Sequence, residues 1–227
     1  MRAANTQSSA LPSVELETRP NPSHSVIWLH GLGADGNDFV PVVDQLDLPP
    51  LGIRFVFPHA PMLAVTINGG FVMRAWYDIL AEDLALREDE AGIRRSQALV
   101  QDMIEREIKR GIPASRIVLA GFSQGGAIAL HTGLRFPKQL AGLMALSAYL
   151  PLAKSVERER KPANNPTPVF MGHGTVDNIV PLPLAVSSRA RLTQLGYRVE
   201  LHEYPMMHAV CPEELADIGA WLKTVLL

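Results

Sequence analysis

The stretch IVLAGFSQGGAIAL, residues 117–130, combines an apolar run, a Gly-x-Ser-x-Gly motif and a helical pattern. The apolar run predicts a buried strand and the residues after the motif predict a helix, so the chain must turn sharply at Ser123. In such a turn, Cβ atoms two positions before and after the serine would collide, which explains Gly121 and Gly125. The motif therefore predicts an accessible serine nucleophile beside the free N–H groups of a helix N-terminus, where an oxyanion can be stabilised.

Strand-like and helix-like segments alternate along the rest of the chain. Apolar or alternating runs predict strands at residues 14–18, 25–30, 53–57, 117–121, 143–146, 168–171 and 198–204. Helical spacing and end signals predict helices at residues 91–110, 126–136 and 182–195, and from Pro212 onward. This alternation favours a mostly parallel central sheet flanked by helices. Residues 58–78 are expected to form an irregular loop that lines the site, and residues 154–168 a surface connection.

The length and composition fit one soluble globular domain. The chain has 227 residues, of which 47% are hydrophobic and 19% charged. We expect a flexible N-terminal tail at residues 1–12 and a single domain at residues 13–227. The net charge of −2 and the lack of a basic stripe give no support for binding nucleic acid. Cys211 is the only cysteine, so no internal disulfide is expected. With no secretory signal and no long apolar run, we expect a cytoplasmic protein without stable membrane insertion.

A serine nucleophile needs a histidine base, and the sequence offers seven candidates. In hydrolases with this turn the chain order is serine, acid, histidine, which excludes the three histidines before Ser123. His131 lies within the following helix and His202 inside an alternating strand. His208 follows the last predicted strand, at the carboxyl edge of the sheet where active sites of open parallel sheets lie. We therefore predict His208 as the base, with His173 as the main alternative.

The acid and the oxyanion hole are assigned by the same reasoning. Asp177 follows a predicted strand between Ser123 and His208, where it could fix the histidine tautomer and stabilise the imidazolium. An aspartate in this place can also simply cap a helix or a turn. The glycine-flanked loop after the first buried strand suits an oxyanion hole, so the predicted donors are the backbone N–H groups of Leu32 and Gln124.

Several segments together resemble the carboxylesterase and acyl-protein thioesterase family, which is also described as lysophospholipase-like. The resemblance is carried by the segments HGLGADG (residues 30–36), NGG (68–70), MRAWYD (73–78), GFSQGG (121–126) and HGTVD (173–177), and by His208. It extends from about residue 25 to the C-terminus. It implies an α/β-hydrolase fold without a large lid domain, supports the same triad and oxyanion donors, and implies that the chain can pair into a homodimer. The sequence departs from the family at Met207, where a glycine usually precedes the catalytic histidine; a bulky side chain there would narrow the site or shift the acyl preference.

These observations predict a serine carboxylesterase that cleaves carboxylic esters of short to medium acyl chains through an acyl-enzyme on Ser123. One alternative is an acyl-protein thioesterase or lysophospholipase for long acyl chains. Another is a non-catalytic binding protein on a hydrolase scaffold, and a peptidase is also compatible with the fold. The expected partner is a small-molecule or acylated substrate. Neither an organic cofactor nor a metal is expected. Side chains that could contact the acyl chain, each also a plausible core residue, are Leu63, Met73, Trp76, Tyr149, Leu182, Met206 and Met207.

Overall fold

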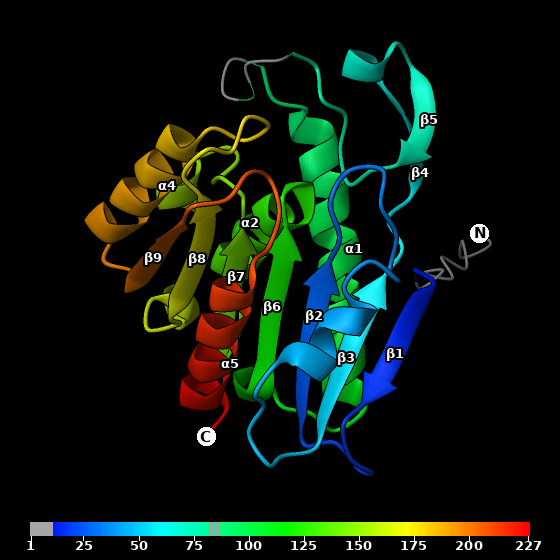
Figure 1. The fold of residues 1–227 in the computed structure, drawn as a ribbon, viewed down its shortest axis with the longest axis vertical. Coiled ribbons are helices and arrows are strands. Elements are labelled where there is room, and N and C mark those ends of the chain that lie inside the picture. The colour runs from blue at the N-terminus through cyan, green and yellow to red at the C-terminus, as the bar shows by residue number, and fades with distance from the viewer. Residues whose placement is uncertain (1–10, 82–83, 85–86) are drawn as a thin grey trace, which may run out of the picture.

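The computed structural model describes residues 11–81, 84 and 87–227 and contains a seven-stranded sheet (Figure 1). The strand order is β1-β3-β2-β6-β7-β8-β9; β1 pairs antiparallel with β3, and the other neighbouring pairs are parallel. The strands are β1 (Ser13–Glu17), β2 (His24–Leu29), β3 (Ile53–Pro58), β6 (Ile117–Phe122), β7 (Gly142–Leu146), β8 (Val169–Gly174) and β9 (Val199–Tyr204). All seven predicted strands are present, which confirms the predicted sheet.

Helices cover both faces of this sheet, as predicted. The structure contains α1 (Glu90–Lys109), α2 (Gln124–Arg135), the short α3 (Val156–Glu159), α4 (Leu182–Gln194) and α5 (Pro212–Leu226). The four predicted helices correspond to α1, α2, α4 and α5. Side chains of α1, α2 and α4 belong to the apolar core on one face, and those of α5 to the core on the other (Figure 1). Among the described residues, no segment forms a large lid domain over the sheet.

The central strands are apolar on both sides because both faces of the sheet are covered. Every residue of β2, β7 and β8 is buried. Helix α2 is also buried along its whole length, because it lies between the sheet and the neighbouring α1. The apolar spacing that predicted α1 also placed Ile93, Val100 and Ile104 on one face of the helix, and all three are fully buried.

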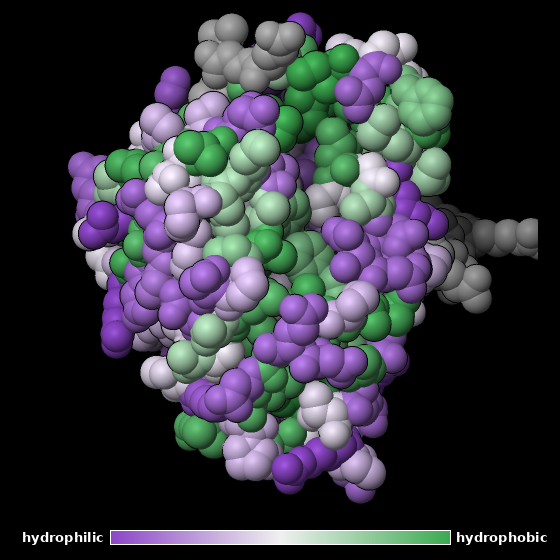
Figure 2. All heavy atoms as spheres, viewed as in Figure 1, coloured by the Kyte–Doolittle hydropathy of each residue, from purple (hydrophilic) through white to green (hydrophobic). Residues whose placement is uncertain are grey.

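The prediction of an irregular loop at residues 58–78 was wrong in part. This region contains a two-stranded antiparallel hairpin, β4 (Met62–Val65) and β5 (Phe71–Arg74), which extends beyond the carboxyl edge of the main sheet (Figure 1). Its turn includes Gly69 and Gly70, both with positive φ, the conformation that glycine adopts readily. Figure 2 shows apolar side chains on the surface at the hairpin. Among them, Met62 is 56% exposed and Phe71 is 68% exposed.

Two other predicted segments need comment. The connection at residues 154–168 includes α3, and its Val156 and Asn164 are fully buried, so it is more than a surface connection. The first ten residues of the predicted tail lie outside the described residues. Within the remainder, Leu11 packs against the core and the Pro12 carbonyl accepts a hydrogen bond from the His59 N–H at 2.8 Å.

Candidate active site

Ser123 stands at the junction of β6 and α2 in a backbone conformation that few residues adopt. Its φ is 53° and its ψ is −121°, and its N–H donates to the Leu146 carbonyl at 2.8 Å. The two motif glycines make this turn possible. A Cβ on Gly121 would lie 2.3 Å from the carbonyl carbon of Gly125, and a Cβ on Gly125 would lie 2.3 Å from the Leu29 oxygen. Any larger residue at either position would force the strand and the helix apart.

His208 links the serine to an aspartate through two hydrogen bonds. The Ser123 hydroxyl lies 2.9 Å from His208 Nε2, and His208 Nδ1 lies 2.7 Å from Asp177 Oδ2. With a proton on Nδ1, the histidine donates to the carboxylate and its free Nε2 accepts from the serine. The Asp177 side chain is fully buried, whereas 16% of the His208 side chain is exposed. The structure thus brings together the predicted nucleophile, base and acid, which are distant in the sequence.

The Asp177 carboxylate is fixed by the loop that carries it. Its Oδ1 accepts the backbone N–H groups of Ile179 and Val180, both at 2.9 Å. These bonds leave Oδ2 to face His208. The predicted alternative base, His173, lies on the other side of the acid, with its Nε2 3.5 Å from Asp177 Oδ2.

His173 is bonded to the protein rather than to the serine. Its Nε2–H donates to the Val180 carbonyl at 2.8 Å, and burial lowers the pKa of this imidazole, which favours the neutral form. A neutral donor in this place holds the loop of residues 174–180 against β8. The arrangement therefore favours His208 as the base and gives His173 a structural role.

The two predicted oxyanion donors belong to residues that line the same cavity as Ser123. Leu32 and Gln124 both line it, and within the described part of the chain neither backbone N–H has an acceptor. The Leu32 loop is held by its neighbours, since the Gly33 N–H donates to the Arg74 carbonyl at 2.9 Å. The loop is fixed again by His30, whose Nδ1–H donates to the Gly31 carbonyl at 2.7 Å.

Buried histidine and glutamine side chains connect this loop to the segment after the hairpin. His30 Nε2 accepts the Ala60 N–H at 3.0 Å, and burial lowers the pKa of this imidazole, so it stays neutral. The Gln124 side-chain oxygen accepts the Trp76 N–H, and its amide donates to the Tyr77 carbonyl, both at 2.7 Å. The residue after the nucleophile thus fixes one wall of the site through its side chain.

The cavity at Ser123 has a volume of about 440 Å³ and is mostly apolar. Besides Ser123, Leu32 and Gln124, it is lined by Ile67, Asn68, Tyr77, Ile79, Leu84, Tyr149, Asn178, Ile179 and Val180. This volume and composition are typical of a site for a small apolar ligand or an acyl chain.

Of the seven predicted acyl contacts, only Tyr149 lines this cavity. Trp76 is only 1% exposed and donates its indole N–H to the His30 carbonyl at 2.9 Å, so it supports the site from behind. Leu63 and Met73 face each other across the hairpin, and Leu182 begins α4. Met207 is 58% exposed beside the base and is not among the residues that line the cavity. The lining residues Ile179 and Val180 lie two and three positions after Asp177, a proximity that the sequence could have indicated.

No metal site or membrane span stands out in the part of the chain that the structure describes. Within residues 11–81, 84 and 87–227, no cluster of three or more His, Cys, Asp or Glu side chains is arranged to hold a metal ion. Over the same residues, no helix combines the length and the apolarity needed to cross a membrane.

Comparison with known proteins gives one consistent family. The profile of the phospholipase/carboxylesterase family matches residues 12–226. The chain is 45% identical over 212 residues to acyl-protein thioesterase 1 of Neurospora crassa, covering 87% of this chain and 85% of that protein. It is 38% identical over 221 residues to acyl-protein thioesterase 1 of Mycosarcoma maydis, covering 90% and 92%.

Solved structures give the same result. The crystal structure of Arabidopsis thaliana SOBER1 superposes with a TM-score of 0.86 at 31% identity, covering 90% of this chain and 99% of that chain.

Proposed function

The chain belongs to the phospholipase/carboxylesterase family of α/β-fold serine hydrolases, and on that premise we propose that it cleaves acyl thioesters formed on protein cysteines. The observation that carries the proposal is the hydrogen-bonded series from Ser123 through His208 to Asp177, which opens into an apolar cavity. The names of the relatives favour the thioester substrate over the carboxylic ester of a short to medium acyl chain.

In the proposed reaction, the Ser123 oxygen attacks the thioester carbonyl carbon while His208 Nε2 takes the hydroxyl proton. The Asp177 carboxylate stabilises the imidazolium that forms. The Leu32 and Gln124 N–H groups donate to the oxyanion of the tetrahedral intermediate. The carbon–sulfur bond then breaks, and the leaving cysteine sulfur receives the proton from His208.

Water completes the proposed cycle. It attacks the acyl-enzyme carbonyl while His208 takes one of its protons, and the returning Ser123 oxygen receives that proton as the carboxylic acid leaves. The net reaction is thioester plus water to thiol plus carboxylic acid. Of the groups that these steps use, Ser123, Leu32 and Gln124 line the cavity, and His208 and Asp177 are joined to Ser123 by hydrogen bonds.

Ester hydrolysis is the second candidate function, and the family description favours it. An oxygen ester reacts by the same steps, with an alcohol as the leaving group. This reading includes lysophospholipids as well as simple carboxylic esters.

A cytoplasmic location, pairing into a homodimer and the division into a tail and one domain stay proposals. Light scattering on a sizing column would test the homodimer.

The test uses an S-acylated peptide, its oxygen-ester analogue and p-nitrophenyl butyrate. We expect the wild type to release free thiol from the peptide and Ser123→Ala to lose this activity by about 10³-fold or more. Ser115→Ala, an exposed serine at the other end of β6, is the matched control and should keep wild-type rates. A wild type that cleaves the butyrate but releases no thiol would favour the carboxylesterase reading. Thiol release that survives Ser123→Ala would exclude the proposed nucleophile.

A further inference from the structure

We propose that the paired hydroxyls of Tyr77 and Tyr149 form the end wall of the acyl cavity and set the longest acyl chain that the enzyme accepts. The inference rests on the proposed function, because it takes the cavity at Ser123 to hold the acyl group. It identifies the two tyrosines as specificity-determining residues for that group.

The first observation is a second cavity directly behind Tyr149. This cavity has a volume of about 490 Å³, similar to the 440 Å³ of the cavity at Ser123. Tyr149 is the only described residue that lines both, whereas Tyr77 lines only the cavity at Ser123. The Tyr149 ring is therefore the partition between the two spaces.

The second observation is that this partition is held in place. Tyr77 is 2% exposed and Tyr149 7%, and their hydroxyl oxygens lie 3.1 Å apart. Burial raises the pKa of both phenols, that of Tyr149 to about 12, so both stay neutral near pH 7. Turning the Tyr149 ring aside would leave two buried hydroxyl groups without their partner, which is costly.

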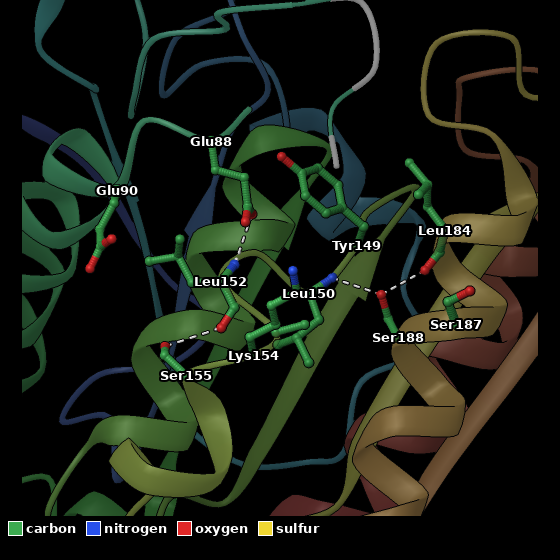
Figure 3. A pocket seen from close by; sticks show the side chains of 11 residues that line it. Glu88, Glu90, Tyr149, Leu150, Leu152, Lys154, Ser155, Leu184, Ser187 and Ser188 are labelled. Carbon is green, nitrogen blue, oxygen red and sulfur yellow. Dashed lines mark hydrogen bonds between the residues drawn. The ribbon is translucent and has the colours of Figure 1, made fainter. Parts of the chain in front are cut away.

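The third observation is the nature of the second cavity (Figure 3). Leu150, Leu152 and Leu184 line it, and its inner polar groups are already bonded to the protein. The Ser188 hydroxyl accepts the Leu150 N–H at 2.8 Å and donates to the Leu184 carbonyl. The Glu88 carboxylate accepts the Leu152 N–H at 2.8 Å.

With these polar groups engaged, the surface left for a ligand consists of leucine, tyrosine and Ala153, next to the polar side chains of Glu90, Lys154 and Ser187. It would suit the end of an acyl chain if the partition were absent. In the wild type, a chain that reaches Tyr149 has no further apolar space, and additional methylenes must stay in water or displace the ring. Each methylene moved from water into an apolar cavity strengthens binding by about fourfold.

The test measures kcat/KM for p-nitrophenyl esters from two to sixteen carbons and reports the ratio of the long-chain to the short-chain value for each variant. Tyr149→Ala should join the two cavities and raise this ratio by about tenfold or more, the effect of roughly two newly buried methylenes. The double variant Tyr149→Ala/Leu184→Trp fills the second cavity again and should return the ratio to the wild-type value. Leu184→Trp alone is the matched control and should keep the wild-type ratio.

Two conservative variants keep the test decisive if Tyr149→Ala does not fold. Tyr77→Phe and Tyr149→Phe each remove one hydroxyl and keep the ring. Without the hydrogen bond between the two hydroxyls, the ring at position 149 can turn aside, and the long-chain to short-chain ratio should rise about threefold. A ratio that is unchanged or lower in the folded variants would overturn the proposal. So would a rise in Tyr149→Ala that Leu184→Trp does not reverse.

The outcomes are separate from those for the proposed function. A wild type that cleaves esters but no thioester would contradict the thioesterase proposal and still allow the chain-length comparison. A wild type that releases thiol but shows no change of ratio in the variants would contradict only the role of the tyrosine pair.

Discussion

The buried carboxyl of Glu214 should make the protein less stable as the pH rises, and Glu214→Gln should remove that dependence. Glu214 lies in the first turn of α5, is fully buried and packs on Gly172; a Cβ there would lie 2.0 Å from Glu214 Oε1. Within the described residues neither carboxyl oxygen has a hydrogen-bond partner. The Cys211 N–H is near enough to lower the pKa slightly, but burial dominates and raises the pKa from 4.5 to about 8.

The size of the effect follows from this pKa. Between pH 4.5 and about pH 8 the folded protein holds a proton on Glu214 that the unfolded chain has released, so stability falls as the pH rises. The contribution is fully present below pH 4.5 and is lost by about pH 8. Each pKa unit corresponds to about 1.4 kcal/mol, so the free energy of unfolding should fall by about 3 kcal/mol between pH 5 and pH 8.

Urea unfolding of wild type and Glu214→Gln at pH 5 and pH 8, followed by circular dichroism, measures this directly. The measured quantity is the difference in unfolding free energy between wild type and variant, taken at pH 5 and again at pH 8. Burying the glutamine amide costs the same at both pH values, so it does not affect the change in this difference. Glu213→Gln, an exposed neighbour, is the control and should follow the wild type at both pH values. A wild-type minus variant difference that is the same at pH 5 and pH 8 would refute a neutral Glu214 in the folded state.

Three further predictions concern the site. Asp177→Asn should lower kcat by roughly 10³- to 10⁴-fold with little change in KM, because the amide no longer fixes the His208 tautomer; steady-state kinetics would show it, and a loss below tenfold would contradict the role of the acid. Gly125→Ala should give a protein that is inactive or does not fold, since its Cβ would lie 2.3 Å from the Leu29 oxygen, and a folded variant with wild-type activity would be incompatible with this turn. Met207→Gly should change the ratio of long- to short-chain ester activity by less than about twofold, because the Met207 side chain is 58% exposed; a larger shift would support the expectation from the sequence that Met207 shapes acyl preference.

Most of the fold could be predicted because the decisive patterns are local. An apolar run followed by Gly-x-Ser-x-Gly and a helical pattern specifies a strand, a sharp turn and a helix, and all three are present around Ser123. The candidate base and acid were also accessible to reasoning, because the carboxyl ends of parallel strands meet at one edge of the sheet. The structure brings Asp177 and His208 to that edge and within hydrogen-bond distance of each other.

The β4–β5 hairpin escaped prediction because its sequence lacks the usual alternation of apolar and polar residues. Four consecutive apolar residues make up β4, and the exposed Phe71 and Val72 are adjacent in β5. The Asn68-Gly69-Gly70 turn was the available signal, since such dipeptides favour hairpins.

Apart from Tyr149, the side chains that line the acyl cavity could not be predicted, for a different reason. Its side chains come from segments separated by up to about 150 residues, from Leu32 to Val180, and which face of each loop turns inward depends on packing. The Tyr77–Tyr149 bond joins residues 72 positions apart, and neither local sequence indicates the other.

The complete burial of α2 has a consequence for how the enzyme loses activity. Every residue from Gln124 to Arg135 is buried, so solvent reaches this helix only when the elements packed around it separate from it. Its amide hydrogens should exchange with deuterated water only through unfolding of the whole domain, in the slowest-exchanging class of the protein. Ser123 directly precedes this helix, so its geometry should be lost only when the domain unfolds. Loss of the serine's geometry and loss of the native state are then a single cooperative event.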